Sequence, residues 1–225
     1  MGKITILPET TRNPITLIGE RAGVCWGADI SDKDKNRARG LDCLAANHGR
    51  TLEYVNIECV IEGYSARVMR EWYTHIGCLP TRLQESTRYV DYKNFDYVIP
   101  PSVSNIDLAK QIYEDVMSHI SRAAIALEEL GVPREDSAMV LPLAMETRVV
   151  DKRNLRNVID MSRQRECTRA YWEYRSMFQD YLTALSKYSD EWQYIVQTQM
   201  MPKCEVLGYC PEKKSCGRKP KKTQQ

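Results

Sequence analysis

Apolar side chains fall at regular intervals along most of the chain, and their spacing predicts the secondary structure. The clearest helix is expected at residues 106–130, where apolar positions recur every three or four residues and Gly131 follows as a stop. Residues 52–64 alternate between apolar and polar side chains, which is typical of a strand. Further helices are expected at residues 34–47, 65–75, 154–165 and 168–188, and a short helix is expected to start at Pro133.

Two other segments are expected to be extended. Residues 3–18 contain two prolines, which favours a short edge strand followed by a loop. Residues 146–153 predict a second extended piece. Helices and strands therefore alternate along the chain, and we expect an α/β fold in which helices pack around an antiparallel sheet.

Length and charge set the domain organisation. A chain of 225 residues is long enough to bury a core without disulfides. The net charge is only +2, but residues 203–225 carry seven basic and two acidic side chains. We therefore expect one domain at residues 1–201 and a basic, cysteine-containing tail at residues 202–225. No apolar run reaches the roughly 20 residues that a membrane span needs, so we expect a cytoplasmic protein without a membrane partner.

The tail also carries three cysteines in a C-x5-C-x5-C series, namely Cys204, Cys210 and Cys216. Thiolates bind zinc, but a tetrahedral site needs a fourth ligand, and the tight C-x2-C pair of zinc knuckles is missing. A partner subunit could supply that ligand. The sequence leaves open a loosely packed basic tail, a metal site and a redox site, and our primary expectation is that the chain holds no metal.

Two polar segments stand out as candidate sites. Residues 79–92 place Arg82, Arg88 and several hydroxyl and amide side chains just beyond a helix end, which suits either a solvated loop or an anion site. The helix in residues 140–178 carries four arginines and few aliphatic side chains, namely Arg153, Arg156, Arg163 and Arg165. On spacing alone, such a helix is more often an exposed surface than a ligand site.

Taken together and in this order, the two segments resemble the flavin-dependent thymidylate synthases. The first family pattern, an R-Q-W helix followed by R-H-R and then S-x-R-Y, is matched by Arg70-Glu71-Trp72, by His75 and by Ser86-Thr87-Arg88-Tyr89. The second pattern is matched by Leu141-Pro142-Leu143, Thr147, Asn154-Leu155-Arg156, Arg165 and Trp172-Glu173. An upstream H-G-H-x-T-x-x-E pattern is matched at His48, Gly49, Thr51 and Glu53. The resemblance covers residues 21–181.

The chain departs from the family pattern at several positions. Thr74 and Ile76 replace the two hallmark arginines, and nine residues rather than seven precede Ser86. The longer loop contains Arg82, which could restore a cation near the flavin. Ala138 stands where the family has an arginine that reaches the nucleotide phosphate.

The resemblance implies conversion of dUMP to dTMP, with methylenetetrahydrofolate as carbon donor and with FAD that is reduced by NADPH. It implies Arg165 as the catalytic residue. It assigns dUMP to Glu71, Gln84, Glu85, Ser86, Thr87, Arg88 and Arg165. It assigns FAD to Thr51, Glu53, His75, Arg82, Asn154 and Arg169. It also implies a homotetramer whose active sites are shared between subunits.

Two alternatives remain. The same fold and flavin could modify another pyrimidine nucleotide, because the Ala138 and Glu71 replacements both fall at the nucleotide site. A protein without catalytic activity could instead bind nucleotides or nucleic acid through its basic tail, although the small net charge makes a nucleic-acid partner the weaker expectation.

Overall fold

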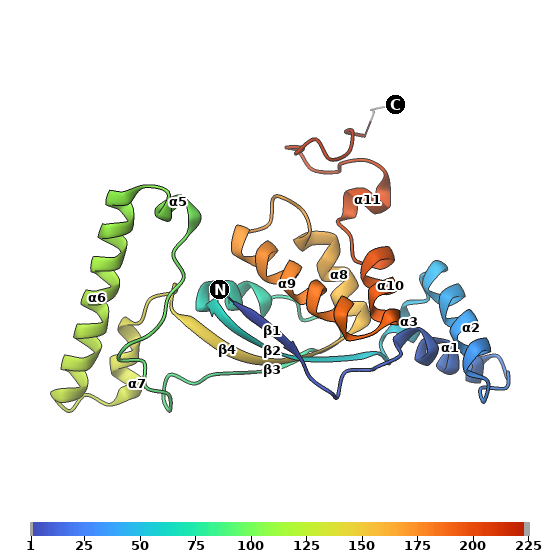
Figure 1. Ribbon diagram of the computed structural model, residues 1–225, viewed down its shortest axis with the longest axis horizontal. Helices are drawn as coiled ribbons and strands as arrows, with labels where there is room; N and C mark the ends of the chain where they lie inside the picture. Colours follow the sequence, from blue (N-terminus) through green and yellow to red (C-terminus); the bar gives the residue numbers. More distant parts are fainter. Residues whose placement is uncertain (1, 223–225) are drawn as a thin grey trace. The chain divides into compact units, whose positions relative to one another are not determined.

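The computed structural model describes residues 2–222 and contains a four-stranded antiparallel sheet. The strands are β1 (Lys3–Ile6), β2 (Asn56–Ser65), β3 (Thr81–Gln84) and β4 (Glu146–Asn154), and their order across the sheet is β1-β2-β4-β3 (Figure 1). The α/β class and the antiparallel sheet expected from the sequence are confirmed. The domain boundary expected at residue 202 stays a prediction, and residues 1 and 223–225 of the two expected segments lie outside the described residues.

Helices account for most of the remaining chain. The longer ones are α1 (Pro14–Cys25), α2 (Lys33–Ala45), α6 (Asp107–Glu129), α8 (Leu155–Arg165), α9 (Trp172–Tyr188) and α10 (Asp190–Gln199). The shorter ones are α3 (Gly49–Leu52), α4 (Ala66–Trp72), α5 (Pro101–Ser104), α7 (Arg134–Ser137), the 3-10 turn η1 (Ala138–Val140) and α11 (Lys203–Leu207). None of the helices between residues 2 and 222 is both long and apolar enough to cross a membrane.

The described chain divides into two compact units. Among the described residues, unit 1 contains residues 2–3, 61–73 and 83–150. Unit 2 contains residues 4–60, 74–82 and 151–222. The strands of the sheet run through both units, while each long helix belongs to one of them.

The core of unit 2 lies where α8 and α9 cover the sheet. Figure 1 shows both helices beside the strands, and their buried side chains include Leu155, Met161 and Phe178. On the strand side, Ile57 and Cys59 are buried at alternate positions of β2. This alternation is the period-2 pattern that predicted the strand, and it places the apolar side of β2 under the helices.

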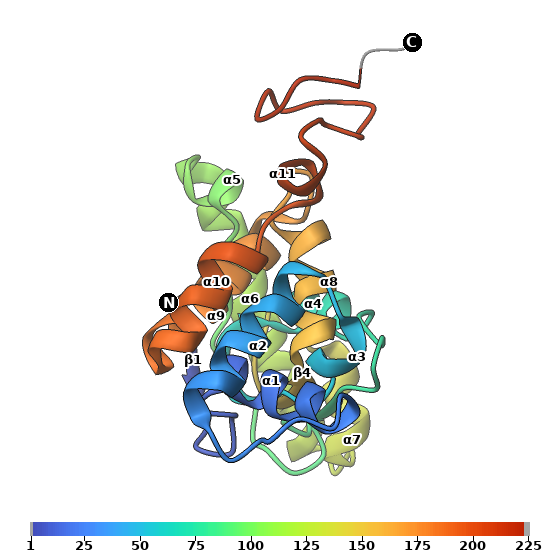
Figure 2. The ribbon, with the colours of Figure 1, turned by 90° about the vertical axis from the view of Figure 1, so that its right-hand side faces the viewer.

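Two glycines bring α1 and α2 into close contact within unit 2 (Figure 2). A Cβ on Gly40 would lie 1.9 Å from the Ile15 carbonyl oxygen, and a Cβ on Gly19 would lie 1.7 Å from the Asn36 carbonyl oxygen. Both distances are far below any van der Waals contact. The glycine in the middle of α2, which weakens a helix on its own, is therefore explained by helix packing.

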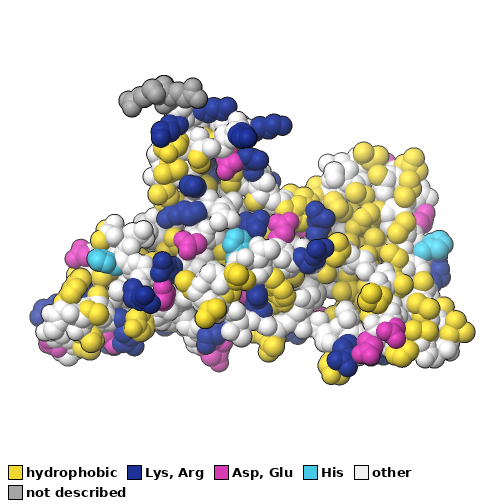
Figure 3. Space-filling model, turned by 180° about the vertical axis from the view of Figure 1, so that it is seen from behind, with side chains coloured by type: hydrophobic (Ala, Val, Ile, Leu, Met, Phe, Trp, Pro, Cys, Tyr) yellow, Lys and Arg dark blue, Asp and Glu magenta, His cyan; other side chains and the backbone are white. Residues whose placement is uncertain are grey.

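The long helix α6 of unit 1 exposes much of its apolar stripe. Leu108, Ile112 and Val116 are 67%, 56% and 47% exposed, whereas Met117 and Ala124 are buried. Figure 3 shows hydrophobic side chains gathered on this part of the surface. Since these apolar positions are spaced by four residues, they form one continuous face of the helix that this chain leaves uncovered.

Several predicted boundaries agree with the structure. The helix expected at residues 106–130 is α6, and Gly131 has φ +87° just beyond its end. The helix expected at residues 65–75 starts as predicted, because the Ser65 hydroxyl accepts a hydrogen bond from the Val68 N–H at 3.2 Å. It ends at Trp72, so His75 lies beyond it.

Other expectations were wrong. Residues 14–18 were expected to be a loop, but α1 begins at Pro14, where a fixed φ and a missing N–H are compatible with the first helical turn. The strand expected from residue 52 begins only at Asn56, because α3 precedes it. The polar loop at residues 79–92 contains the edge strand β3. The extended piece expected at residues 146–153 is β4, so Arg153 belongs to this strand and not to the helix with which it was also grouped.

Candidate functional site

The predicted catalytic residue, Arg165, is held by a histidine and a tyrosine of unit 2. Its Nε donates a hydrogen bond of 2.8 Å to Nε2 of His75. Its guanidinium carbon lies 4.3 Å from the centre of the Tyr174 ring, and the His75 and Tyr174 rings meet edge to face at 6.0 Å. Arg165 ends α8 and Tyr174 belongs to α9, so two helices and the loop after α4 build this cluster.

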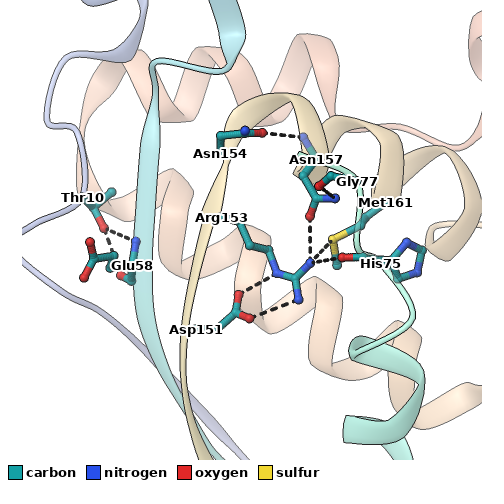
Figure 4. A network of polar contacts seen from close by, with 9 residues as sticks. All are labelled: Thr10, Glu58, His75, Gly77, Asp151, Arg153, Asn154, Asn157 and Met161. Atoms are coloured by element: carbon teal, nitrogen blue, oxygen red, sulfur yellow. Dashed lines mark hydrogen bonds and ion pairs between the residues drawn. The ribbon is translucent and has the colours of Figure 1, made fainter. Parts of the chain in front are cut away.

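A buried arginine binds the backbone of the same loop (Figure 4). Arg153 forms a two-point ion pair with Asp151, with Nε–Oδ2 and Nη2–Oδ1 distances of 2.6 and 3.1 Å. Its Nη1 donates to the His75 carbonyl oxygen at 3.2 Å and to Oδ1 of Asn157 at 2.7 Å. The Asn157 amide in turn donates to the Gly77 carbonyl oxygen at 2.7 Å. The backbone around His75 is thus fixed by polar contacts from β4 and α8.

Sequence reasoning missed this network. Asp151 and Arg153 are 1% and 2% exposed and alternate with exposed side chains along β4. An Asp and an Arg two positions apart in a strand point to the same face, and the neighbouring buried residue on that face is Val149. The combination of opposite charges two positions apart on one strand face was the available signal.

Two arginines and burial keep His75 uncharged at neutral pH. Burial, followed by the positive charges of Arg165 and Arg153, lowers the pKa of His75 from 6.5 to about 4. A neutral imidazole can accept the hydrogen bond from Arg165, while an imidazolium could not. The positive charge of this cluster therefore resides on the arginines.

The other predicted FAD residues also belong to unit 2, but the structure uses several of them locally. Asn154 is the N-cap of α8, since its Oδ1 accepts from the Asn157 N–H at 3.0 Å. The Thr51 hydroxyl donates to the His48 carbonyl oxygen at 2.8 Å. Glu53 pairs with Arg156 at 2.6 Å.

The two remaining FAD candidates are also in unit 2. Arg169 pairs with Glu212 of the tail, and Arg82 is partly exposed in β3.

The predicted dUMP residues other than Arg165 belong to unit 1. Gln84 donates from Nε2 to the Thr147 hydroxyl at 3.2 Å, and the Glu85 N–H donates to the Arg148 carbonyl oxygen at 2.8 Å. These contacts attach the start of the loop to β4. Glu71 lies on α4, near its end.

Three predicted dUMP residues form a tight turn in unit 1, namely Ser86, Thr87 and Arg88. The Ser86 hydroxyl accepts from the Arg88 N–H at 3.2 Å. The Arg88 side chain pairs with Glu135 at 2.8 Å, and both side chains are more than half exposed. Thr87 lines a small cavity that also contains Ala138 and Arg134.

Arg134 is a basic residue of this region that the sequence comparison missed. Its Nη1 donates to the Tyr89 carbonyl oxygen at 3.3 Å, beside the S-x-R-Y segment. It lies one turn before Ala138, which stands where the family has an arginine. The chain therefore keeps a guanidinium next to this position, although it comes from a different residue.

A second cavity of unit 1, of about 270 Å³, has acidic walls. Its carboxylates are Glu62, Glu85, Asp91, Asp96 and Glu146. Tyr92 also lines it, and burial together with the nearby Glu85 raises the pKa of Tyr92 to about 12. Such walls disfavour a phosphate, so an anion bound by the Ser86 turn would not sit in this cavity.

A cavity of about 530 Å³ in unit 2 lies between the tail and the loop after α8. It contains Arg165 and Arg169 and is lined by four cysteines, namely Cys167, Cys204, Cys210 and Cys216. Within residues 2–222, no group of three or more His, Cys, Asp or Glu side chains is placed so that it could hold a metal ion.

Comparisons with known proteins identify the family of the chain. Residues 7–189 match the model of the family "Thymidylate synthase complementing protein". The chain is 31% identical to the flavin-dependent thymidylate synthase of Nitratidesulfovibrio vulgaris, over 84% of this chain and 79% of that protein. It is 28% identical to the enzyme of the same name from Clostridium tetani, over 97% and 94% of the two chains. The chain belongs to the thymidylate synthase complementing protein family.

Proposed function

We propose that the chain is a flavin-dependent thymidylate synthase that converts dUMP to dTMP. It would use methylenetetrahydrofolate as carbon donor and FAD reduced by NADPH. The observation that carries this proposal is the fixed position of Arg165 within a family match that covers residues 7–189. The relatives from Nitratidesulfovibrio vulgaris, Clostridium tetani and Geobacter sulfurreducens carry the name of this activity.

The donor set of unit 2 fits FAD. A flavin dinucleotide carries a pyrophosphate, which is bound by cations and by hydrogen-bond donors. The FAD candidates are donors or cations except for one carboxylate, Glu53, whose charge is balanced by Arg156 at 2.6 Å. We assign FAD to Thr51, Glu53, His75, Arg82, Asn154 and Arg169. When bound, it supplies the redox chemistry of the reaction.

Arg165 has the geometry of a group that stabilises charge at a defined atom. The hydrogen bond from Nε to His75 fixes one edge of the guanidinium, and the Tyr174 ring lies against it. We assign Arg165 to the uracil carbonyl edge, where negative charge develops as C5 becomes nucleophilic. A donor that is held in place before the reaction costs no reorganisation at that moment, which is why preorganised charges are effective.

The nucleotide phosphate is assigned to the Ser86 turn of unit 1, with Ser86, Thr87 and Arg88 as ligands. Gln84, Glu85 and Glu71 are assigned to the sugar and base. Arg134 lies in the same small cavity as Thr87 and Ala138, and we assign it the role of the arginine that Ala138 replaces.

A related acceptor, another pyrimidine nucleotide, is the second candidate. The observation that favours it is the Ala138 replacement, because it changes the cation set around the phosphate. A non-catalytic protein that binds nucleic acid through its tail is the third candidate. Its only support is the local basic charge of residues 203–225.

The test combines a spectrum with an assay. Purified protein should show the absorption of oxidised flavin at roughly 450 nm, which is a property of the cofactor itself. With NADPH and methylenetetrahydrofolate, the protein should release tritium from 5-labelled dUMP, and Arg165→Met should release at least about 100-fold less. Coloured protein that acts only on another labelled pyrimidine nucleotide would favour the second candidate. Colourless protein that does not bind added FAD would refute both.

The apolar face of α6 supports the proposed homotetramer. Three apolar side chains that are about half exposed or more, at successive turns of one helix, form a surface that a second copy could cover. Ile112→Glu should therefore lower the molar mass in light scattering. Asp115→Lys is the matched control, because Asp115 is an exposed residue of the same helix. Equal masses for both variants and the parent would contradict this role of α6.

A further inference from the structure

Four cysteines from two distant parts of the sequence line one cavity of unit 2. Cys204, Cys210 and Cys216 come from the tail, and Cys167 comes from the loop between α8 and α9. All four are free thiols, and Cys204 and Cys210 are only 9% exposed. The three cysteines of the tail lacked a fourth thiol ligand in the sequence. Cys167 of the same chain adds a fourth thiol to them in this cavity.

Several contacts join the tail to the loop that carries Cys167. Arg218 donates to the Glu166 carbonyl oxygen at 3.2 Å, and Glu212 pairs with Arg169. The Thr168 side chain forms a hydrogen bond with the Cys216 side chain. Within the tail, the Cys210 N–H donates to the Pro220 carbonyl oxygen at 2.7 Å. The gathering of the cysteines is therefore part of a folded segment.

The charge around the cavity suits a dianionic centre. Apart from Glu212, the charged side chains that line it are basic, namely Arg163, Arg165, Arg169, Lys203, Lys214, Arg218 and Lys219. A metal centre with four thiolates carries excess negative charge, which costs much free energy to bury without positive partners. Figure 3 shows Lys and Arg side chains gathered on the tail.

The size of the cavity favours an iron–sulfur cluster over a single zinc ion. Four thiolates on one zinc ion, each at ~2.3 Å from it, lie within about 4 Å of one another. These four cysteines are among the residues that line a cavity of about 530 Å³, and within residues 2–222 no group of three or more His, Cys, Asp or Glu side chains is placed so that it could hold a metal ion. A cuboidal cluster places iron and sulfide between its thiolates and therefore needs a wider ring of cysteines.

We propose that Cys167, Cys204, Cys210 and Cys216 bind one [4Fe–4S] cluster. The cluster ties the tail to the loop that carries Arg169 and so closes one side of the site around Arg165. This assignment rests on the cysteines and does not depend on the thymidylate synthase activity proposed above.

The first test uses the full chain, expressed and purified without oxygen. Metal and sulfide analysis should give about four iron atoms and about four acid-labile sulfides per chain. Flavin obscures the visible spectrum, so a Mössbauer spectrum of protein grown on isotope-enriched iron identifies the cluster. One zinc per chain without sulfide, a disulfide between two of these cysteines, or a metal-free protein would each overturn the proposal.

Variants locate the cluster. Cys167→Ser and Cys210→Ser should each lose most of the iron and sulfide, while Cys25→Ser should keep both. Cys25 is a suitable control because it is an exposed cysteine that does not line the cavity. Circular dichroism checks that each variant folds, and the analysis of the parent chain stands even if a variant does not. Unchanged iron in Cys167→Ser and Cys210→Ser would place the cluster elsewhere.

Discussion

The buried pair of Asp151 and Arg153 allows a quantitative test of what holds the site together. Arg153→Met removes a guanidinium whose side chain is fully buried, and so takes the two-point ion pair away from the Asp151 carboxylate, which is 1% exposed. Removing one partner of a buried ion pair lowers the free energy of unfolding by about 3–5 kcal/mol. That loss is a large part of the roughly 5–15 kcal/mol by which a domain is stable.

A double variant separates the pair from the rest of the network. Asp151→Leu combined with Arg153→Met removes both charges, so no uncompensated charge stays buried. The Asn157 amide oxygen and the His75 carbonyl oxygen still lose a donor. We therefore expect the double variant to be less stable than the parent. Its loss of stability should be smaller than the sum of the losses of the two single variants, by at least about 1–2 kcal/mol.

The assay is urea unfolding at one fixed protein concentration, because association of subunits shifts apparent stability. Lys152→Met is the matched control. Lys152 precedes Arg153 on β4, but it is exposed and pairs with Glu58 at 3.1 Å on the surface. Its loss should cost about 1 kcal/mol or less. The reasoning would be refuted if Arg153→Met cost no more than Lys152→Met.

Three further predictions concern single residues of the two units. The folded-state pKa of His75, about 4, lies below its usual 6.5. Its contribution to stability is therefore present above pH 6.5 and is lost as the pH falls toward 4. The parent should lose about 1–2 kcal/mol more than His75→Gln between pH 7 and pH 4, after allowing for partial exposure of the ring. Gly40→Ala should destabilise by at least about 1–3 kcal/mol despite the better helix propensity of alanine, since its Cβ would overlap the Ile15 carbonyl oxygen; an increase in melting temperature would contradict this packing. Ser65→Ala should cost about 1 kcal/mol through the lost cap of α4, and Ser65→Thr, which keeps the hydroxyl at this buried position, should recover part of it in thermal unfolding.

The sequence predicted those parts of the fold that local patterns determine. The helix α6 has a strong period and a glycine stop, and Ser65 is a helix cap that acts within three residues. The contact that explains Gly40 lies on another helix, which no local pattern reveals. For the same reason, the sequence could only describe α2 as a helix that tolerates a glycine.

In the candidate site, too, some features could be predicted from the sequence and others depend on contacts between remote segments. The family resemblance assigned Arg165 to dUMP and His75 to FAD, and the structure joins the two side chains by a hydrogen bond of 2.8 Å. The Asp151–Arg153 pair was missed because the burial of these two side chains depends on tertiary packing over β4, which no local pattern reveals. Cys167 could not be connected to the tail cysteines, because its role depends on a fold that brings remote segments together.

The bond between Arg165 and His75 also fixes a property of the imidazole ring itself. The arginine Nε can only donate, so Nε2 of the neutral ring must be the acceptor, and its single hydrogen must reside on Nδ1. The histidine is thus held in one tautomer. Its two nitrogens have opposite roles: one is committed to the arginine, and the other presents an N–H group to its surroundings.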